Sequence, residues 1–459
     1  MAATRTLSWR RAAAAVLLVA LTGCTDDESA EPVGNPRAYD VQSYDVDASV
    51  TIEGDDQLDA VTTIVAVAEE PLENFELDLV GLEVERVLVD GEPAEFTRPS
   101  GLLSITPASP IGRGTEFTAE VHYSGDPSQE GDADEALEAG GGWLDLGDSY
   151  SVVVAEPVGA RTWLPSNDVP SDKATVTVEV EVPGLLSAVS NGVLAQRPAI
   201  DAESGRWRWV ATEPMAPYLI TLAVGEFGVS SRTAPGGPEI IDAFPPTHRE
   251  LAERFDRTGE MLAFLAERFG PYPFSTGGAI VVPGMPQTAL ETQTRPVYSV
   301  AALEHEDEGG QLVLHELAHQ WFGDAVTPES WDDVWLNEGP AVYSQWLWLE
   351  SNDGPSVLES ARASWDPDDP ALDVPPADPG DDLFGASVYE RSAIFLVELR
   401  ELMGLDAFHE LLRTWVEEHR FANATTDEFV ELAGELHGSS IESLSDPWLY
   451  GDELPPLTF

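Results

Sequence analysis

The segment Leu312-Val-Leu-His-Glu-Leu-Ala-His-Gln-Trp-Phe-Gly323 combines an apolar run with two histidines spaced four residues apart. Positions i and i+4 lie on one face of an α-helix, one turn apart, so His315 and His319 can bind the same ion. Zinc accepts histidine nitrogens at about 2.0–2.1 Å. Glu316 is placed to hold a zinc-bound water as general base. Gly323 follows the apolar run and predicts the end of the helix.

A third zinc ligand is expected from a second helix, predicted over residues 332–349. Glu338 lies in this helix, and 18 residues separate it from His319. A tight connection would bring the two helices side by side, so the Glu338 carboxylate can complete the site. Two histidines, one glutamate and a water form the open arrangement of a catalytic zinc. The sequence therefore predicts one catalytic Zn²⁺ per chain, which would polarise a carbonyl and lower the pKa of water.

The rest of the chain divides into two regions of different character. Over residues 39–228, short runs of alternating apolar and polar residues are separated by turn residues, which is typical of β-strands. From residue 229 to 459 helical spacing dominates, first over 248–269, with one strand-like run at 279–282. We expect an α+β, multidomain fold in which a β-sandwich or open barrel precedes a mainly α domain. The strands expected in the first region lie at residues 44–50, 61–67, 75–79, 84–89, 117–123, 152–154, 174–182 and 218–224.

The N-terminus carries signals for export. A short apolar run at residues 12–21 follows three arginines, and it is well below the roughly 20 residues that a membrane-spanning helix needs. It ends in Leu-Thr-Gly-Cys24, which resembles a bacterial lipobox. Residues 1–23 are therefore predicted to be a lipoprotein signal peptide, Cys24 the lipidated residue, and 24–38 an acidic flexible tether. We expect an extracytoplasmic protein anchored to the bacterial cell membrane; secretion after an ordinary signal peptide is the alternative.

The composition is strongly acidic. The chain carries 83 Asp and Glu against 23 Lys and Arg, a formal net charge of −60. Such a surface repels nucleic acid and anionic lipid, so neither is an expected partner. A single cysteine excludes an intrachain disulfide, and a metal in the folded body must then use His, Asp or Glu. A stretch rich in Pro and Asp at 366–382 is predicted to be a solvated loop, with calcium binding as the alternative.

The two predicted helices carry a family resemblance. His315-Glu-Leu-Ala-His-Gln-Trp-Phe-Gly323, followed by Trp335-Leu-Asn-Glu-Gly339, resembles the zinc signature of the aminopeptidase N-type gluzincins, which include the leukotriene A hydrolases. The resemblance implies an antiparallel β domain of sandwich or saddle form and then a thermolysin-like zinc domain. Pro340 departs from the pattern, and we expect it in the first turn of a helix that begins near Asn337. The chain stops soon after Trp448, without the long C-terminal helical domain of larger members, which predicts an open cleft.

The resemblance also implies roles for residues outside the zinc signature. Glu291, in Thr288-Ala-Leu-Glu-Thr292, matches the family glutamate that grips the free α-amine of the substrate, and Ala289 is kept beside it. Glu156 matches a second amine anchor, contributed by the β domain. Tyr389 matches the tyrosine whose hydroxyl stabilises the tetrahedral oxyanion. Apart from the resemblance, Asp333 is a candidate for orienting a zinc ligand, because it lies two residues before Trp335.

Taken together, these residues predict a zinc aminopeptidase. A peptide with a free N-terminus would bind between the two domains, Glu316 would act as general base and Tyr389 would stabilise the oxyanion. One alternative is a zinc endopeptidase or a non-peptide hydrolase of the same fold. Another is a lipid-anchored peptide-binding protein without turnover, which predicts the loss of a zinc ligand or of Glu316. The sequence keeps Glu316 and all three predicted zinc ligands, His315, His319 and Glu338, which disfavours this second alternative.

Overall fold

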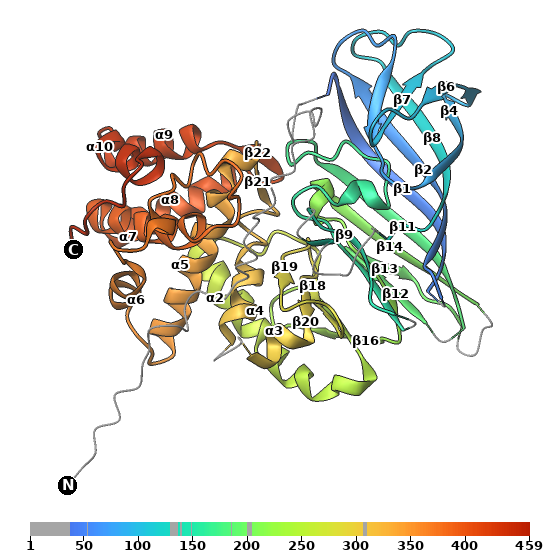
Figure 1. Cartoon of the computed structure of the whole chain (residues 1–459). Helices are drawn as coiled ribbons and strands as arrows, with labels where there is room; N and C mark the ends of the chain where they lie inside the picture. The colour runs from blue at the N-terminus through green and yellow to red at the C-terminus, as the bar shows by residue number, and fades with distance from the viewer. Residues whose placement is uncertain are drawn as a thin grey trace.

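The computed structural model of the chain describes residues 37–52, 54–128, 136–137, 140–147, 149–184, 186–199, 204–305 and 310–459. The predicted signal peptide and Cys24 lie outside these residues. Figure 1 shows the β-rich first half of the chain on one side and the helical C-terminal part on the other, which confirms the α+β class. Within the described ranges, no helix combines the length and the apolar character needed to cross a bilayer.

An eight-stranded sheet forms the body of the β domain, in the order β13-β14-β11-β1-β2-β8-β4-β5. Burial alternates along β1 and β2, because successive side chains of a strand point to opposite faces and one face packs against the core. The strands of this sheet are β1 (Tyr39–Thr51), β2 (Gln57–Ala68), β4 (Glu83–Val89), β5 (Glu92–Pro93), β8 (Glu116–Gly125), β11 (Ala174–Pro183), β13 (Val193–Gln196) and β14 (Ser204–Met215).

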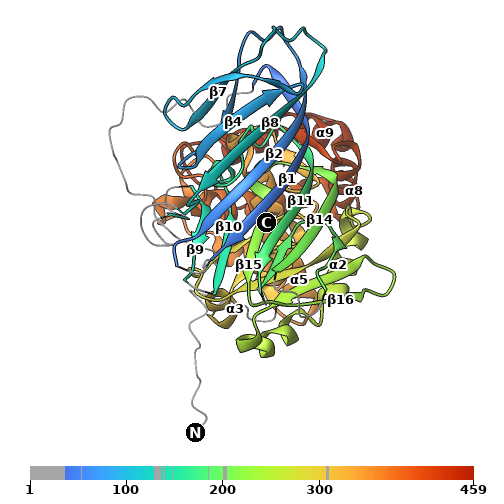
Figure 2. The same ribbon diagram turned by 90° about the vertical axis from the view of Figure 1, so that its right-hand side faces the viewer.

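One pairing in this sheet departs from the expected antiparallel arrangement. β1 runs antiparallel to β2 but parallel to β11, with Ser43 opposite Thr175 and Ser49 opposite Glu181. A parallel pair needs a long crossover, and the chain between β1 and β11 supplies one. Figure 2 looks onto this sheet, with the helices behind it.

Two smaller sheets complete the β domain. One holds β3 (Phe75–Asp78), β6 (Glu95–Thr97) and β7 (Leu102–Thr106), and the other holds β9 (Gly142–Asp145), β10 (Tyr150–Val154), β12 (Ser187–Ser190) and β15 (Leu222–Gly225). The strand expected at 218–224 is only partly present. Residues Pro217–Leu219 form a 3₁₀ turn, because Pro217 fixes its φ angle and has no N–H for a ladder, and the strand begins at Leu222.

The second half of the chain starts with a five-stranded sheet, of which the sequence predicted only the central strand. The sheet order is β16 (Gly228–Thr233), β17 (Glu239–Phe244), β18 (Thr276–Val282), β20 (Val297–Ser299) and β19 (Ala289–Leu290). The single helix expected at 248–269 is two pieces, a 3₁₀ segment at Pro246–Phe255 and α2 at Thr258–Phe269. His248 adopts non-helical angles (φ −132°, ψ 42°) inside the first piece.

The remaining elements are mostly helices. They are α3 (Val300–His305), α4 (Gln311–Ala318), α5 (Trp335–Ser351), α6 (Val357–Ser364), α7 (Ser392–Met403), α8 (Leu405–Glu418), α9 (Thr426–His437) and α10 (Glu442–Ser445), with a short pair of strands β21 (Val326–Pro328) and β22 (Ala422–Ala424). Every residue of α5 from Trp335 to Ser344 is buried, as expected of a helix enclosed by others.

Pro340 does not lie in the first turn of its helix, as the sequence predicted. A 3₁₀ turn at Trp331–Asp333 feeds directly into α5, so the helix begins at Trp335 and Pro340 is its sixth residue. The carbonyl of Leu336 therefore loses the N–H that an ordinary residue would donate four positions later.

Candidate metal centre and substrate site

The predicted metal ligands come from two neighbouring helices. His315 lies in α4, and His319 directly follows α4 with helical backbone angles (φ −57°, ψ −24°), so both imidazoles point from one face. Glu338 lies near the start of α5, which packs against α4. Glu338 Oε2 is 3.2 Å from His315 Nε2 and 3.5 Å from His319 Nε2.

These distances fit a tetrahedral zinc ion. Ligand atoms that each lie about 2.0–2.1 Å from such an ion are separated from one another by roughly 3.3–3.4 Å. His319 Nδ1 donates to the Phe322 carbonyl at 3.1 Å, which leaves the lone pair of Nε2 for the metal. Two imidazoles and one carboxylate, all buried, form a donor set with one position left for a water.

Two glycines allow the segments that carry the site to approach closely. Gly323 has a φ angle of +121°, and a Cβ there would lie 3.2 Å from side-chain atoms of Asn337. A Cβ on Gly339 would lie only 2.7 Å from the Cβ of Ser392. The turn after α4 and the start of α7 can therefore press directly against the beginning of α5, which carries Glu338.

Three more carboxylates face the zinc ligands from separate elements. Glu316 belongs to α4, Glu291 follows β19 and Glu156 follows β10 of the β domain. Oxygens of Glu291 and Glu316 lie within 4.8 Å of a His319 nitrogen, and oxygens of Glu156 and Glu291 lie within 4.8 Å of a Glu338 oxygen. Among the described residues, neither Glu291 Oε1 nor Glu156 Oε1 has a hydrogen-bond partner, although both atoms are buried.

Local backbone packing places the two candidate amine anchors. The chain around Glu156 is pressed against the glycines before β9, where a Cβ on Gly141 would lie 2.3 Å from the carbonyl oxygen of Val154. Glu291 extends from β19, in which the half-buried Ala289 pairs antiparallel with Tyr298. The structure thus brings Ala289 to the strand that leads into the site.

The surroundings raise the pKa of three carboxyl groups of the site and lower the pKa of the fourth. Burial raises the pKa of Glu156 well above its usual range, and the carboxylates of Glu291 and Glu338 add to the rise. Burial also raises the pKa of Glu291 and Glu316. Glu338 differs, because its two histidine partners outweigh burial and lower its pKa to about 2. The site therefore holds the ionised Glu338 beside the two histidines and three further acidic side chains. This excess of acidic groups favours a bound cation.

Tyr389 approaches the same centre from the turn before α7. Its ring centroid lies 6.2 Å from that of His315, with 19° between the ring planes. Burial raises the pKa of Tyr389 well above its usual value, and the carboxylates of Glu338 and Glu156 raise it further. The hydroxyl therefore stays protonated and can donate a hydrogen bond to a developing negative charge.

One sequence hypothesis fails in the structure, and the alternative of calcium in the acidic loop gains no support. Asp333 does not orient a zinc ligand, because Asp333 Oδ1 accepts hydrogen bonds from the backbone N–H and the hydroxyl of Thr426 at the start of α9. The acidic loop 366–382, which is described throughout, does not bring three Asp or Glu side chains together as a metal site. Its Asp369 instead caps the short 3₁₀ turn at Pro370–Leu372.

Sequence reasoning missed two ionisable residues beside the site, the half-buried Lys173 and the buried Asp324. Lys173 of the β domain donates from Nζ to the carbonyls of Asp324 and Ala325 and to Thr327 Oγ1, at 2.8, 3.2 and 2.7 Å. Burial raises the pKa of Asp324 well above its usual range, Glu291 adds to this, and Lys173 opposes it. The available signals were weak: Lys173 is the only lysine of the chain, and Asp324 directly follows the zinc signature.

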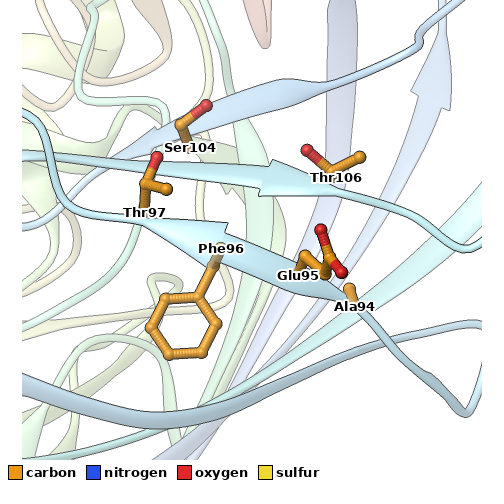
Figure 3. A pocket seen from close by; sticks show the side chains of 6 residues that line it. All are labelled: Ala94, Glu95, Phe96, Thr97, Ser104 and Thr106. Carbon is orange, nitrogen blue, oxygen red and sulfur yellow. The ribbon is translucent and has the colours of Figure 1, made fainter.

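A cavity elsewhere on the molecule does not belong to this site. It has a volume of about 410 Å³ and lies on the three-stranded sheet of the β domain, lined by residues of β6 and β7 such as Phe96 and Thr106 (Figure 3). None of the predicted site residues lines it.

Comparison with known proteins relates both halves of the chain to one family. Residues 253–448 match the Peptidase family M1 domain, and residues 40–219 match the Peptidase M1 N-terminal domain. A two-domain M1 zinc metallopeptidase, solved as an alanine variant bound to L-arginine, has a TM-score of 0.82 and 30% identity over 93% of this chain and 97% of its own. An M1 zinc metallopeptidase from Deinococcus radiodurans, bound to a Tyr-Ser-Ala substrate, has a TM-score of 0.80 and 30% identity over 92% and 96% of the two chains.

Curated relatives are more distant and longer. Aminopeptidase 2 of Candida albicans is 26% identical over 318 residues, which cover 64% of this chain and 34% of the relative. The chain thus spans about a third of the length of that relative.

Proposed function

Because the chain belongs to the M1 family of zinc metallopeptidases, we propose that it is an aminopeptidase that releases N-terminal residues from peptides with a free α-amine. The observation that carries the proposal is the placement of Glu156 and Glu291. Each has a buried oxygen without a hydrogen-bond partner among the described residues, next to the zinc ligands. A protonated amine offers the charge and the N–H donors that these oxygens lack.

The proposed mechanism assigns each residue one task. Zinc held by His315, His319 and Glu338 would polarise the scissile carbonyl and lower the pKa of a water. Glu291 and Glu156 bind the substrate ammonium and so fix which peptide bond faces the centre. Glu316 removes a proton from the attacking water and passes it to the leaving amine. The Tyr389 hydroxyl donates a hydrogen bond to the oxyanion.

The ligands of the structural neighbours support this proposal over an endopeptidase. Those proteins were solved with L-arginine, with L-tryptophan and with the tripeptide Tyr-Ser-Ala, each of which carries a free α-amine. In this chain the amine would occupy the space beside Glu291, which an endopeptidase would need for the preceding residue of its substrate. A binding protein without turnover is disfavoured, because the zinc ligands and Glu316 are all present.

The test compares substrates with free and blocked amines. Aminoacyl nitroanilides should be hydrolysed, and their N-acetyl counterparts should be cleaved at least about 100-fold more slowly, since the acetyl group removes the charge that Glu291 and Glu156 bind. Glu291→Gln should raise KM, whereas the matched control Glu250→Gln, at an exposed site, should leave it unchanged. Equal cleavage of blocked and free substrates would overturn the aminopeptidase assignment.

We also propose that the protein is exported and held at the cell membrane through lipid on Cys24. The lipobox-like Leu-Thr-Gly-Cys sequence supports this proposal. Cells fed a clickable fatty acid should label the wild-type chain and not Cys24→Ser, and the variant should leave the membrane fraction. Equal labelling of the two would contradict it.

A further inference from the structure

Arg391 lies two residues after Tyr389 and is fully buried. Its guanidinium donates to six backbone carbonyls at 2.7–3.2 Å, from two segments that are distant in sequence. The acceptors are Leu372, Asp373 and Val374 in the acidic loop, and Pro447, Trp448 and Gly451 near the C-terminus. Burial lowers the pKa of Arg391 to about 10, which leaves the side chain charged at neutral pH.

The C-terminal segment, residues 446–459, is held along its length by further contacts. The Leu454 N–H donates to Asp373 Oδ1 at 2.9 Å, and Trp365 Nε1 donates to the Pro455 carbonyl at 2.9 Å. The Thr458 N–H donates to Glu398 Oε1 of α7 at 2.7 Å. This segment therefore joins α6, the acidic loop and α7, and Arg391 lies where it meets the turn that carries Tyr389.

That turn has an unusual geometry. Residues Ser387–Arg391 form a single π-helical turn before α7, in which the Ser392 N–H donates to the Ser387 carbonyl. A π turn is less favourable than an α turn and persists where surrounding contacts hold it. Relaxation to an α turn would rotate Tyr389 relative to His315, so contacts outside the turn must maintain its position.

We propose that Arg391 is a positioning residue: by joining residues 372–374 and 447–451 around the π turn, it sets the place of the Tyr389 hydroxyl at the metal centre. The inference rests on the proposed role of Tyr389 in hydrolysis. Only a guanidinium suits the task, because its nitrogens point to both segments at once. A lysine carries its three donors on one atom and cannot reach both sets of carbonyls.

The test is a double-mutant cycle between Arg391→Lys and Tyr389→Phe, measured as kcat and KM on an aminoacyl nitroanilide. If Arg391 acts through Tyr389, Arg391→Lys lowers kcat about 10-fold or more in the wild type, with KM nearly unchanged and zinc content retained. In the Tyr389→Phe background the same change has little further effect. An equal kcat loss in both backgrounds, or no loss in either, overturns the inference.

A matched control variant and a rescue experiment separate the proposed positioning role from a general loss of structure. Arg362→Lys is the matched control, because Arg362 contacts the same C-terminal segment over the Phe459 ring but lies on α6. It should leave kcat unchanged. If Arg391→Lys fails to fold, Arg391→Gly assayed with added guanidinium takes its place, and failure of guanidinium to restore kcat counts against the inference. Should Tyr389→Phe retain full activity, the proposed role of Tyr389 falls, while aminopeptidase activity itself can still stand.

Discussion

Glu316 and Glu338 are two carboxyl groups of one site whose surroundings shift their pKa values in opposite directions. Glu338 Oε2 lies between two imidazole nitrogens, and these histidines lower its pKa to about 2, so it is ionised, as its proposed role as a zinc ligand requires. Glu316 lies one residue after His315, where burial raises its pKa well above the usual range. A carboxyl group with a raised pKa suits proton transfer near neutral pH.

Replacing Glu316 with Gln should therefore separate metal binding from catalysis. The amide keeps the size of the side chain but cannot accept the proton of the attacking water. We expect the variant to retain one zinc per chain, measured by elemental analysis, while kcat falls by about 10³-fold or more. Glu338→Gln, in contrast, should lose zinc. Hydrolysis by the Glu316→Gln protein at a rate near wild type would contradict the assignment.

The close contact between α5 and α7 governs the site at the level of elements. Gly339 lies directly after the ligand Glu338, and an added Cβ would lie 2.7 Å from the Cβ of Ser392. The contact joins the helix that carries a metal ligand to the helix that follows Tyr389. The two helices can keep their present separation only while residue 339 has no side chain.

Gly339→Ala should force these helices apart. We expect a loss of about 1–3 kcal/mol in the free energy of unfolding, as in other overpacked cores, together with weaker zinc binding. Adding Ser392→Gly removes the opposing Cβ and should restore part of both properties. Urea denaturation and zinc titration check the prediction, and a Gly339→Ala protein with wild-type stability and zinc affinity would refute it.

A buried carboxyl group joins β1 to the segment before β11. Asp172 accepts from the Val41 N–H at 3.0 Å and from Asn167 Nδ2 at 2.6 Å. Burial raises the pKa of Asp172 to about 7, although both hydrogen bonds oppose the rise. Since the unfolded chain releases this proton at a lower pH, the folded state binds more protons between about pH 4 and 7.

The stability contributed by Asp172 should therefore fall as the pH rises through this window. The expected slope approaches about 1.4 kcal/mol per pH unit, the value for one proton. Asp172→Asn does not titrate, and Asn167 can rotate its amide because Asn167 Oδ1 has no hydrogen-bond partner in the described part of the chain. Urea denaturation of both proteins from pH 4.5 to 7.5 should show that the free energy of unfolding of the variant rises relative to that of the wild type as the pH increases. A difference that does not change with pH would count against this account.

At the scale of the whole molecule, the β domain is fastened to the catalytic half beside the metal centre. Lys173 reaches from the β domain to the turn after the zinc signature, and Asn423 Nδ2 donates to the carbonyl of Pro170 at 2.9 Å. The same β domain supplies Glu156. Its attachment therefore determines both the stability of the molecule and the position of one candidate amine anchor.

Lys173→Met should loosen this attachment. The variant loses three hydrogen bonds and a basic group beside Asp324, so we expect the free energy of unfolding to fall by about 2–4 kcal/mol. KM for free-amine substrates should rise as Glu156 becomes less well placed, while zinc stays bound. Denaturation followed by tryptophan fluorescence and steady-state kinetics test both effects. A variant with unchanged stability and KM would show that Lys173 does not hold the domains together.

Features that depend on short spacing could be predicted from the order of the residues alone. His315 and His319 lie one helical turn apart, and the strands of the β domain can be recognised because apolar and polar residues alternate along them. The 18-residue separation from His319 pointed to Glu338, and the family resemblance pointed to Glu291 and Tyr389; the structure gathers all three around one centre. Such signals are local, because residues a few positions apart in a helix or strand already have fixed relative directions.

The contacts between distant segments could be known from the folded chain alone. The parallel pairing of β1 with β11, the role of Asp333 at the start of α9, and the carbonyls around Arg391 all join residues far apart in the chain. A charged side chain looks the same in sequence whether it faces water or a buried carbonyl. Its partners are set by how whole sheets and helices pack to bury apolar surface, and that packing is a property of the complete chain.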